Sequence, residues 1–111
     1  MLGPGKYEVE IFHVQPHFSP YLEWLESLDA QTRTRIQTRT LRLQQGQFGD
    51  YKKLDHNLYE LCMFFGPGYR VYFGERRTKR ILLILGGDKS SQSSDIKKAR
   101  ELWKIYLKDN S

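Results

Sequence analysis

The sequence has little cysteine and no long hydrophobic run. Its single cysteine, Cys62, has no partner for an internal disulfide and no C-x-x-C companion for zinc, which is typical of a reducing compartment. The longest apolar run, ILLIL at residues 81–85, is far shorter than the roughly 20 residues of a membrane-spanning helix. No basic-then-apolar signal segment opens the sequence. We therefore expect a cytoplasmic protein without membrane association.

Internal repeats and low-complexity tracts are also absent, which excludes a solenoid and gives no sign of a linker. The 111 residues amount to about one ordinary domain, so we expect a single domain over residues 1–111. Hydrophobic residues make up 39% of the chain and aromatic residues 14%, which is enough for a packed core. The net charge of +5 favours acidic or phosphate-bearing partners.

The first half of the sequence predicts a strand and two helices. Residues 6–14 alternate between apolar and polar side chains, as in a half-buried strand. Ser19 is the expected N-cap of a short amphipathic helix, with Pro20 at its first position. Asp29 is the expected N-cap of a second helix that ends at Gly46. The two helices should form a hairpin.

The second predicted helix carries four arginines and no acidic residue, which gives it a positive stripe: Arg33, Arg35, Arg39 and Arg42. Two interpretations are compatible with this stripe. It is either a solvated helix face or a surface for nucleic acid or another partner.

The second half predicts a loop and then strands. Residues 47–57 are expected to form the loop. Two segments rich in aromatic and β-branched residues follow, 58–65 and 69–73, joined by Gly-Pro-Gly at residues 66–68. Glycine reaches the backbone angles that tight turns need, so this pattern predicts a β-hairpin.

The run RILLIL at residues 80–85 shows no alternation, which is typical of a strand buried on both faces, and Gly86-Gly87 is expected to end it. Ser93 or Ser94 is the expected N-cap of a last helix. The predicted fold class is α+β in the order β-α-α-β-β-β-α. The helical hairpin and the C-terminal helix would pack around a four-stranded, mostly antiparallel sheet.

Arg70 lies in the middle of an otherwise apolar strand. Alternation places Arg70 and Tyr72 on the sheet face opposite the core, which we expect to be open, and the three-residue connection makes Cys62 the cross-strand neighbour of Arg70. An ion pair with a carboxylate such as Glu60 is one interpretation of this arginine. A binding site for phosphate is the other.

The segment GGDKSSQSSD at residues 86–95 supports the phosphate interpretation, because backbone N–H groups at a helix start favour anions. It also supplies Lys89. We expect Arg70, Lys89, Lys52 and Lys53 to line one concave, positive surface.

Several stretches of the sequence resemble the RelE/ParE superfamily of type II toxin–antitoxin toxins, and more narrowly its addiction-module killer, HigB-like branch. They are YLEWLESLD, GQFGDYKKL, LYEL, GPGYRVYF and ILLILGGDKSSQSSDI. The resemblance runs from about Tyr7 to Leu107. It implies a RelE-like domain with the element order given above.

The resemblance implies a ribosome-dependent mRNA endonuclease that inhibits translation and is neutralised by a cognate antitoxin, of the helix-turn-helix type. No cofactor or metal is implied. Arg70 would clamp the scissile phosphate, and Lys89 would stabilise developing charge or donate a proton. Glu60 and Tyr72 are the further catalytic candidates. The expected RNA-binding residues are Lys52, Lys53, His56, Arg39 and Arg42.

Two positions depart from the pattern of the family, and the superfamily's tyrosine in the terminal segment has no clear match, because the sequence there reads SSQSSDI. Cys62 stands where this branch favours arginine, and Glu60 holds the position of the superfamily's first strand lysine. A glutamate there either acts as general base or neutralises Arg70. Two alternative functions therefore stay open, a ParE-like, non-catalytic inhibitor of gyrase and a degenerate module that only binds the antitoxin.

Overall fold

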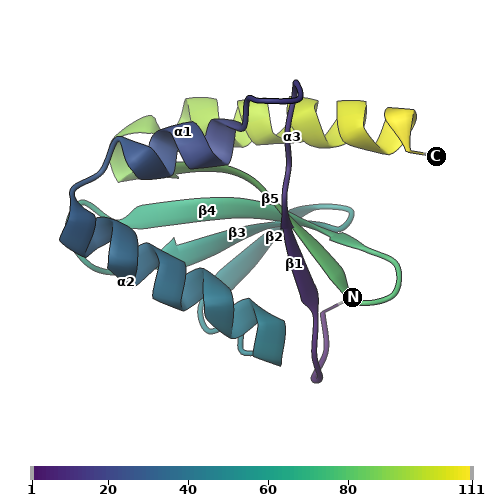
Figure 1. Cartoon of the computed structure of the whole chain (residues 1–111), viewed down its shortest axis with the longest axis horizontal. Coiled ribbons are helices and arrows are strands. Elements are labelled where there is room, and N and C mark those ends of the chain that lie inside the picture. Colours follow the sequence, from purple (N-terminus) through teal and green to yellow (C-terminus); the bar gives the residue numbers. More distant parts are fainter. Residues whose placement is uncertain (1, 111) are drawn as a thin grey trace.

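A five-stranded sheet and three α-helices make up the computed structural model, which describes residues 2–110 (Figure 1). The elements in chain order are β1 (Glu8–Ile11), α1 (Pro20–Glu26), α2 (Ala30–Leu41), β2 (Tyr51–Asp55), β3 (Leu58–Met63), β4 (Tyr69–Arg76), β5 (Arg80–Asp88) and α3 (Gln92–Asp109). One 3₁₀ turn, Arg42–Gln45, extends α2, and another, Lys89–Ser91, precedes α3. The predicted α+β class is confirmed.

The strands lie in the order β1-β5-β4-β3-β2. β1 is parallel to β5, and the other neighbouring pairs are antiparallel. The sheet is therefore mostly antiparallel, as predicted, but the expected number of four strands is wrong. Residues expected to be a loop form β2, an exposed edge strand with the polar sequence YKKLD. β2 is held in place by its pairing with β3, and its sequence shows no hydrophobic alternation from which a strand could be predicted.

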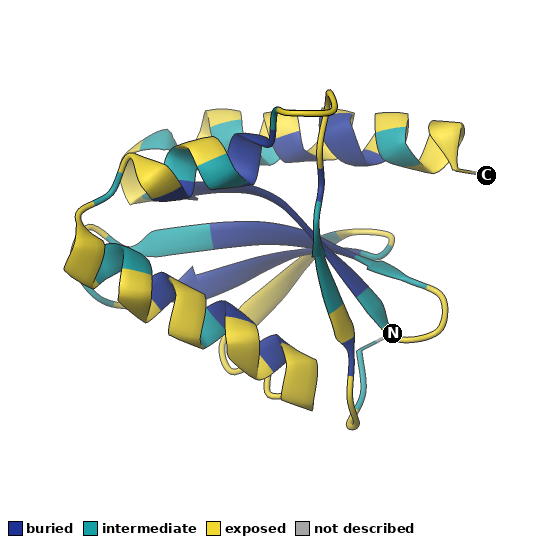
Figure 2. Ribbon diagram, in the orientation of Figure 1, coloured by how far each residue is buried: buried dark blue, intermediate teal, exposed yellow. Residues whose placement is uncertain are grey.

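Helices cover both faces of the sheet. α1 and α2 pack on one face, and α3 packs on the other, so that two hydrophobic clusters form. Figure 2 shows that the helices turn their buried residues toward the sheet and that β2 is exposed. No helix within residues 2–110 is long and apolar enough to cross a membrane.

The predicted starts of the first two helices are confirmed. Ser19 accepts a hydrogen bond from the N–H of Leu22 at 3.2 Å, with Pro20 at the first helical position. Asp29 accepts from the N–H of Thr32 at 3.0 Å. Gly46, at φ 73°, ends the 3₁₀ turn after α2 in the left-handed conformation that glycine adopts most readily. These caps follow from local sequence alone.

The start of α3 differs from the prediction of a Ser93 or Ser94 cap. The 3₁₀ turn Lys89–Ser91 comes first, and Asp88 caps it by accepting from the N–H of Ser90 at 2.8 Å. An aspartate that follows a strand directly can cap the next turn before any later serine does.

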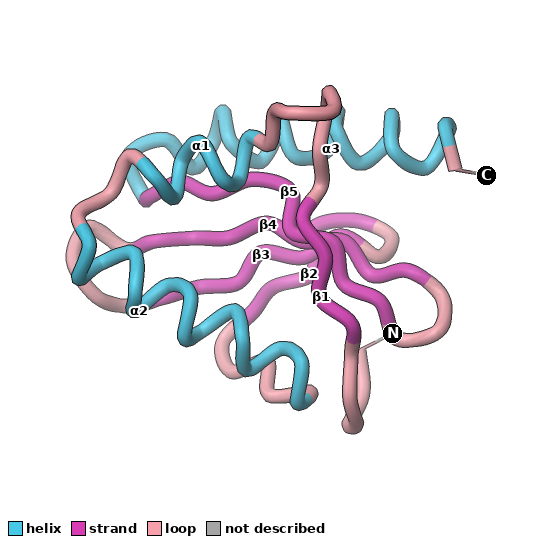
Figure 3. Tube along the Cα trace, in the orientation of Figure 1, coloured by secondary structure: helices cyan, strands magenta, loops and turns pink. Residues whose placement is uncertain are grey.

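β5 lies between β1 and β4, and its residues 81–85 are buried, as predicted. Gly86-Gly87 does not end this strand, which continues to Asp88. The missing side chain at Gly86 instead makes room for α1, since a Cβ on Gly86 would overlap the indole of Trp24. Figure 3 shows the β3–β4 connection at the end of the sheet where α1 meets α2.

We predict that Gly86→Ala lowers the free energy of unfolding by about 1–3 kcal/mol, because the new methyl group overpacks the contact with Trp24. Urea unfolding followed by tryptophan fluorescence measures this. Gly3→Ala is the matched control, since the nearest atom to a Cβ there is 4.0 Å away. Equal stability of the two variants would contradict the prediction.

Candidate functional site

Arg70 and Lys89 meet at one end of the sheet. β4 pairs Arg70 with Gly87 of β5, and Lys89 follows two residues after Gly87. A Cβ on Gly68 would lie 3.4 Å from an Arg70 Nη1 and 3.7 Å from the Lys89 Cβ, so both residues border Gly68. We call Gly68, Arg70 and Lys89 the Arg70 corner. The expected proximity of Arg70 and Lys89 is confirmed.

Arg70 is held by one hydrogen bond and one ion pair. Its Nη1 donates to the carbonyl of Gly68 at 2.8 Å, and its Nε lies 3.7 Å from Glu60 Oε2. Cys62 is its cross-strand neighbour, as predicted. The side chain of Arg70 is 12% exposed, and its Nε has no hydrogen-bond partner among the described residues. The interpretation that Arg70 pairs with Glu60 is therefore confirmed.

On the buried side of Arg70 lies a group of residues that we call the Glu60 cluster: Glu60, Cys62, Tyr72 and Gln92. Glu60 is only 1% exposed. Its carboxylate accepts from Tyr72 Oη and from Gln92 Nε2, each at 3.0 Å, and Cys62 Sγ lies 3.8 Å from it. Two neutral donors and one nearby guanidinium thus compensate a buried negative charge, which would otherwise be costly.

The expectation of an open sheet face at Glu60 and Tyr72 is wrong. α3 covers this face because its own apolar side chains, Ala99, Leu102 and Trp103, pack against it. Tyr72 is 0% exposed, and Gln92 in the first turn of α3 bonds to Glu60. Glu60 therefore contacts Tyr72 and Arg70, and neither Glu60 nor Tyr72 faces the solvent.

Burial raises the pKa of Tyr72, and the charge of Glu60 raises it further. Burial likewise raises the pKa of the Cys62 thiol, again with Glu60 adding to the effect. Both groups consequently keep their protons at neutral pH. Tyr72 acts as a hydrogen-bond donor and Cys62 as a protonated thiol, which is a poor nucleophile.

Lys52 and Lys53 do not both join the Arg70 corner. Lys52 pairs with Glu60 and Lys53 with Tyr59, and both lysines are exposed. Because side chains alternate along a strand, only Lys52 lies on the face of Glu60 and Arg70. The expectation of one surface that includes Lys53 is wrong.

His56 is also distant from Arg70. It lies exposed in the turn before β3, whereas Arg70 pairs with Cys62 near the other end of that strand. Its carbonyl accepts from Trp103 Nε1 at 3.2 Å. The structure therefore gives His56 a contact with α3 and does not bring it to the Arg70 corner.

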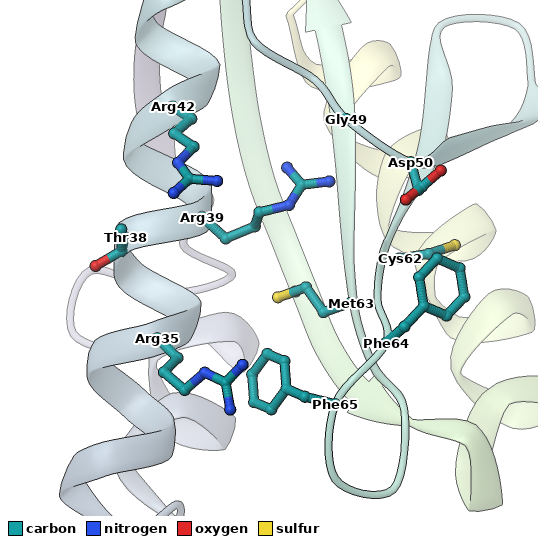
Figure 4. Close-up of a pocket in the computed structure, with 10 residues that line it drawn as sticks. All are labelled: Arg35, Thr38, Arg39, Arg42, Gly49, Asp50, Cys62, Met63, Phe64 and Phe65. Atoms are coloured by element: carbon teal, nitrogen blue, oxygen red, sulfur yellow. The ribbon is translucent and has the colours of Figure 1, made fainter.

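Arg39 and Arg42 lie in a second region, a groove of about 520 Å³ between α2 and the neighbouring ends of β2 and β3 (Figure 4). We call it the arginine groove. Its lining residues are Arg35, Thr38, Arg39, Arg42, Gly49, Asp50, Cys62, Met63, Phe64 and Phe65. The two predicted RNA-binding arginines are thus brought together, on the other side of Cys62 from Arg70.

The arginines of this groove are more than a solvated helix face. The Arg35 guanidinium lies 3.7 Å from the centre of the Phe65 ring, a cation–π contact. Arg39 Nη1 is buried without a hydrogen-bond partner among the described residues. Burial lowers the pKa of Arg39, and the charge of Arg42 lowers it further. An anion bound in the groove would give Arg39 Nη1 an acceptor and would offset the lowering of the pKa of Arg39.

Sequence reasoning missed three residues of these regions. Gln92 lies in the quoted segment GGDKSSQSSD, but its contact with Glu60 depends on where α3 docks. The sequence predicts only a loop at Asp50 and gives no sign that it lines a groove. Phe64, with 77% of its surface exposed, was assigned to a strand without regard to its exposure. Among residues 2–110, no three His, Cys, Asp or Glu side chains are placed to hold a metal ion.

Comparison with known proteins gives one informative match. The chain is 41% identical over 85 residues to a protein of Haemophilus influenzae strain Rd, described as uncharacterized. The match covers 77% of this chain and 84% of that protein. The chain belongs to the same family as this Haemophilus protein. No protein-family model matches the sequence.

We predict that Tyr72→Phe destabilises the protein at neutral pH by about 1–3 kcal/mol, because the buried Glu60 loses a donor. The effect of pH has a definite sign. The raised pKa keeps Tyr72 protonated in the folded state when the unfolded chain has lost that proton. The stability that Tyr72 contributes is thus complete below about pH 10 and declines above it.

Urea unfolding at neutral pH and above about pH 10 checks this prediction. The wild type should lose more stability on this change of pH than Tyr72→Phe does. Tyr51→Phe, which alters an exposed tyrosine, should behave as the wild type does. An unchanged pH dependence in Tyr72→Phe would contradict the prediction.

Proposed function

We propose that this protein is a RelE/ParE-superfamily toxin of the HigB-like branch and acts as a ribosome-dependent mRNA endonuclease that its antitoxin neutralises. The α+β layout supports the assignment, with a helical hairpin on one face of the sheet and a C-terminal helix on the other. β2 is an additional strand relative to the expected layout. The assignment to this family rests on the resemblance of the sequence motifs named above.

The observation that carries the proposal is that Arg70 and Lys89 both border Gly68. Cleavage of RNA by its own 2′-hydroxyl group forms a 2′,3′-cyclic phosphate and breaks the bond to the 5′ oxygen. The proton of the 2′-hydroxyl passes to water, and the leaving 5′ oxygen gains one from the ammonium group of Lys89 or from water. The phosphorus carries extra negative charge in between, and two adjacent cations stabilise that charge.

Arg70 suits this role because its guanidinium is fixed before any substrate arrives. The carbonyl of Gly68 and the carboxylate of Glu60 hold it from the protein side. Fixed charges stabilise a transition state without reorganising during the reaction. We therefore assign Glu60, Tyr72 and Gln92 to the positioning of Arg70 and not to proton transfer. Lys89, which is exposed, contacts the phosphate from the solvent side.

One observation favours a second function, a module that binds its partner without chemistry. Arg70 already has a hydrogen bond to Gly68 and an ion pair with Glu60 and is only 12% exposed, so little of its guanidinium is accessible to a phosphate. Such a module would keep the fold and the antitoxin partner and lose the nuclease.

Expression in bacteria without antitoxin distinguishes these functions, with growth followed and the 5′ ends of mRNA mapped. We expect growth arrest and new 5′ ends within translated codons. Arg70→Lys and Lys89→Ala should each reduce cleavage by about a hundredfold or more, because each removes a contact to the developing charge. Lysine is chosen at Arg70 because alanine would leave the buried Glu60 without a nearby cation.

Lys104→Ala is the control, since it removes one exposed positive charge from α3 away from its first turn. It should cleave as the wild type does. Arrest without new 5′ ends would instead indicate another target, such as gyrase. No arrest at all would favour the binding module, and full cleavage by Arg70→Lys would contradict the role of the Arg70 corner.

A further inference from the structure

The two edges of the sheet differ. β2, at one edge, has the sequence YKKLD with two exposed lysines, and its register with β3 shifts between Lys53 and Asp55. Lysines and irregular pairing on an edge strand keep other strands from adding to it. β1, at the other edge, has the sequence EVEI, with no lysine, no proline and no shift of register. The protein therefore protects the β2 edge in ways that it does not use at β1.

The outer side of β1 has backbone groups without partners. The N–H groups of Glu8 and Phe12 donate to carbonyls on the β5 side, each at 2.9 Å. Because this direction alternates along a strand, the N–H and C=O groups of Val9 and Ile11 point outward. Within residues 2–110, the one partner of these four groups is His13 Nδ1, 3.1 Å from the Ile11 carbonyl. His13 is itself exposed, so β1 offers a free strand edge.

Apolar surface flanks this edge on both faces of the sheet. A groove of about 450 Å³ lies between β1 and the helical hairpin, and we call it the β1 groove. None of its lining residues is charged, and one of them, Leu41, is exposed. A second groove, of about 400 Å³, lies on the α3 face and includes the exposed residues Val14 and Ile105. Exposed apolar surface gathered beside a strand edge is typical of an interface.

The charges around β1 suit a second copy of this chain. The chain carries a net charge of +5, so two copies repel one another wherever their positive surfaces meet. At β1 this excess is absent. The β1 groove is uncharged, and Arg80 Nε lies 2.7 Å from Glu10 Oε2 and 3.9 Å from Glu8 Oε2. Two copies can therefore approach each other here, whereas a strongly charged segment would find no counter-charge in the groove.

We propose that this protein forms a two-fold symmetric dimer in which the β1 strands of two copies pair in antiparallel orientation. Val9 of each copy lies opposite Ile11 of the other, so their outward N–H and C=O groups bond to each other once His13 turns away. The same residues form apolar cross-strand pairs on the face of the β1 groove. On the α3 face the two Glu10 side chains meet, and each keeps its own Arg80 as counter-charge. The dimer does not depend on the proposed nuclease activity.

Sedimentation equilibrium of the whole chain measures the dimer, and amide hydrogen exchange followed by NMR locates it. We expect the mass to rise with concentration from that of one chain to twice that value. The amides of Val9 and Ile11 should become protected over the same range of concentration. The amide of Glu10 points toward β5, so its exchange should not change.

Two variants test the contact. Val9→Pro removes an outward N–H that the single chain does not use, and an edge strand tolerates proline at such a position. Leu41→Lys places a positive charge in the β1 groove, and because Leu41 is exposed this variant keeps the fold even where Val9→Pro does not. Each should raise the dissociation constant of the dimer about tenfold or more. Phe64→Lys is the control, since it changes an exposed residue just after β3 and should dimerise as the wild type does.

A chain that stays monomeric at the concentration of an NMR sample would overturn the proposal and leave the edge to a strand of another protein. A dimer without added protection at Val9 and Ile11 would also overturn it, as would a dimer that neither Val9→Pro nor Leu41→Lys weakens. Equal weakening by Phe64→Lys would do the same, because added positive charge alone would then explain the loss.

Discussion

The buried carboxylate of Glu60 joins three elements of this fold. Glu60 belongs to β3, and its partners Tyr72 and Gln92 belong to β4 and α3. A carboxylate that is 1% exposed is tolerated only with its hydrogen bonds satisfied and a cation nearby. The first turn of α3 must therefore dock where Gln92 reaches Glu60. The position of Arg70 depends on the same group.

These contacts orient the guanidinium of Arg70, and they also limit its access to a ligand. Its guanidinium is oriented by Glu60 and by the carbonyl of Gly68, so its position costs no reorganisation when an anion arrives. The same contacts use part of its hydrogen-bonding capacity and leave it 12% exposed. Lys89 has the opposite property, since it is exposed. One buried, fixed cation and one exposed cation thus form the corner.

The sequence predicts the features that depend on neighbouring residues. The caps at Ser19 and Asp29, the buried run in β5 and the register of Cys62 with Arg70 all follow from neighbouring residues. The covering of Tyr72 by α3 does not, because alternation shows which side chains share a face but not which helix packs on it. β2 was missed for a related reason: a polar edge strand is held by its partner strand and not by its own composition. The same holds for the candidate site. The register of neighbouring strands brings Arg70 close to Lys89, as the sequence predicts, but it places Lys53 and His56 away from them.

The start of β2 beside the arginine groove follows from the sequence at Gly49. Gly49 has φ 60°, which is incompatible with an extended strand, so the chain turns out of the sheet immediately before Asp50 and β2. The Arg39 guanidinium lies against Gly49, where a Cβ would overlap it. Arg39 therefore occupies the space that a side chain at residue 49 would need, and glycine there gives the chain the turn that shortens β2. Arg39 and the glycine that precedes β2 are thus packed against each other, so the position of this positive charge and the start of the strand depend on one contact.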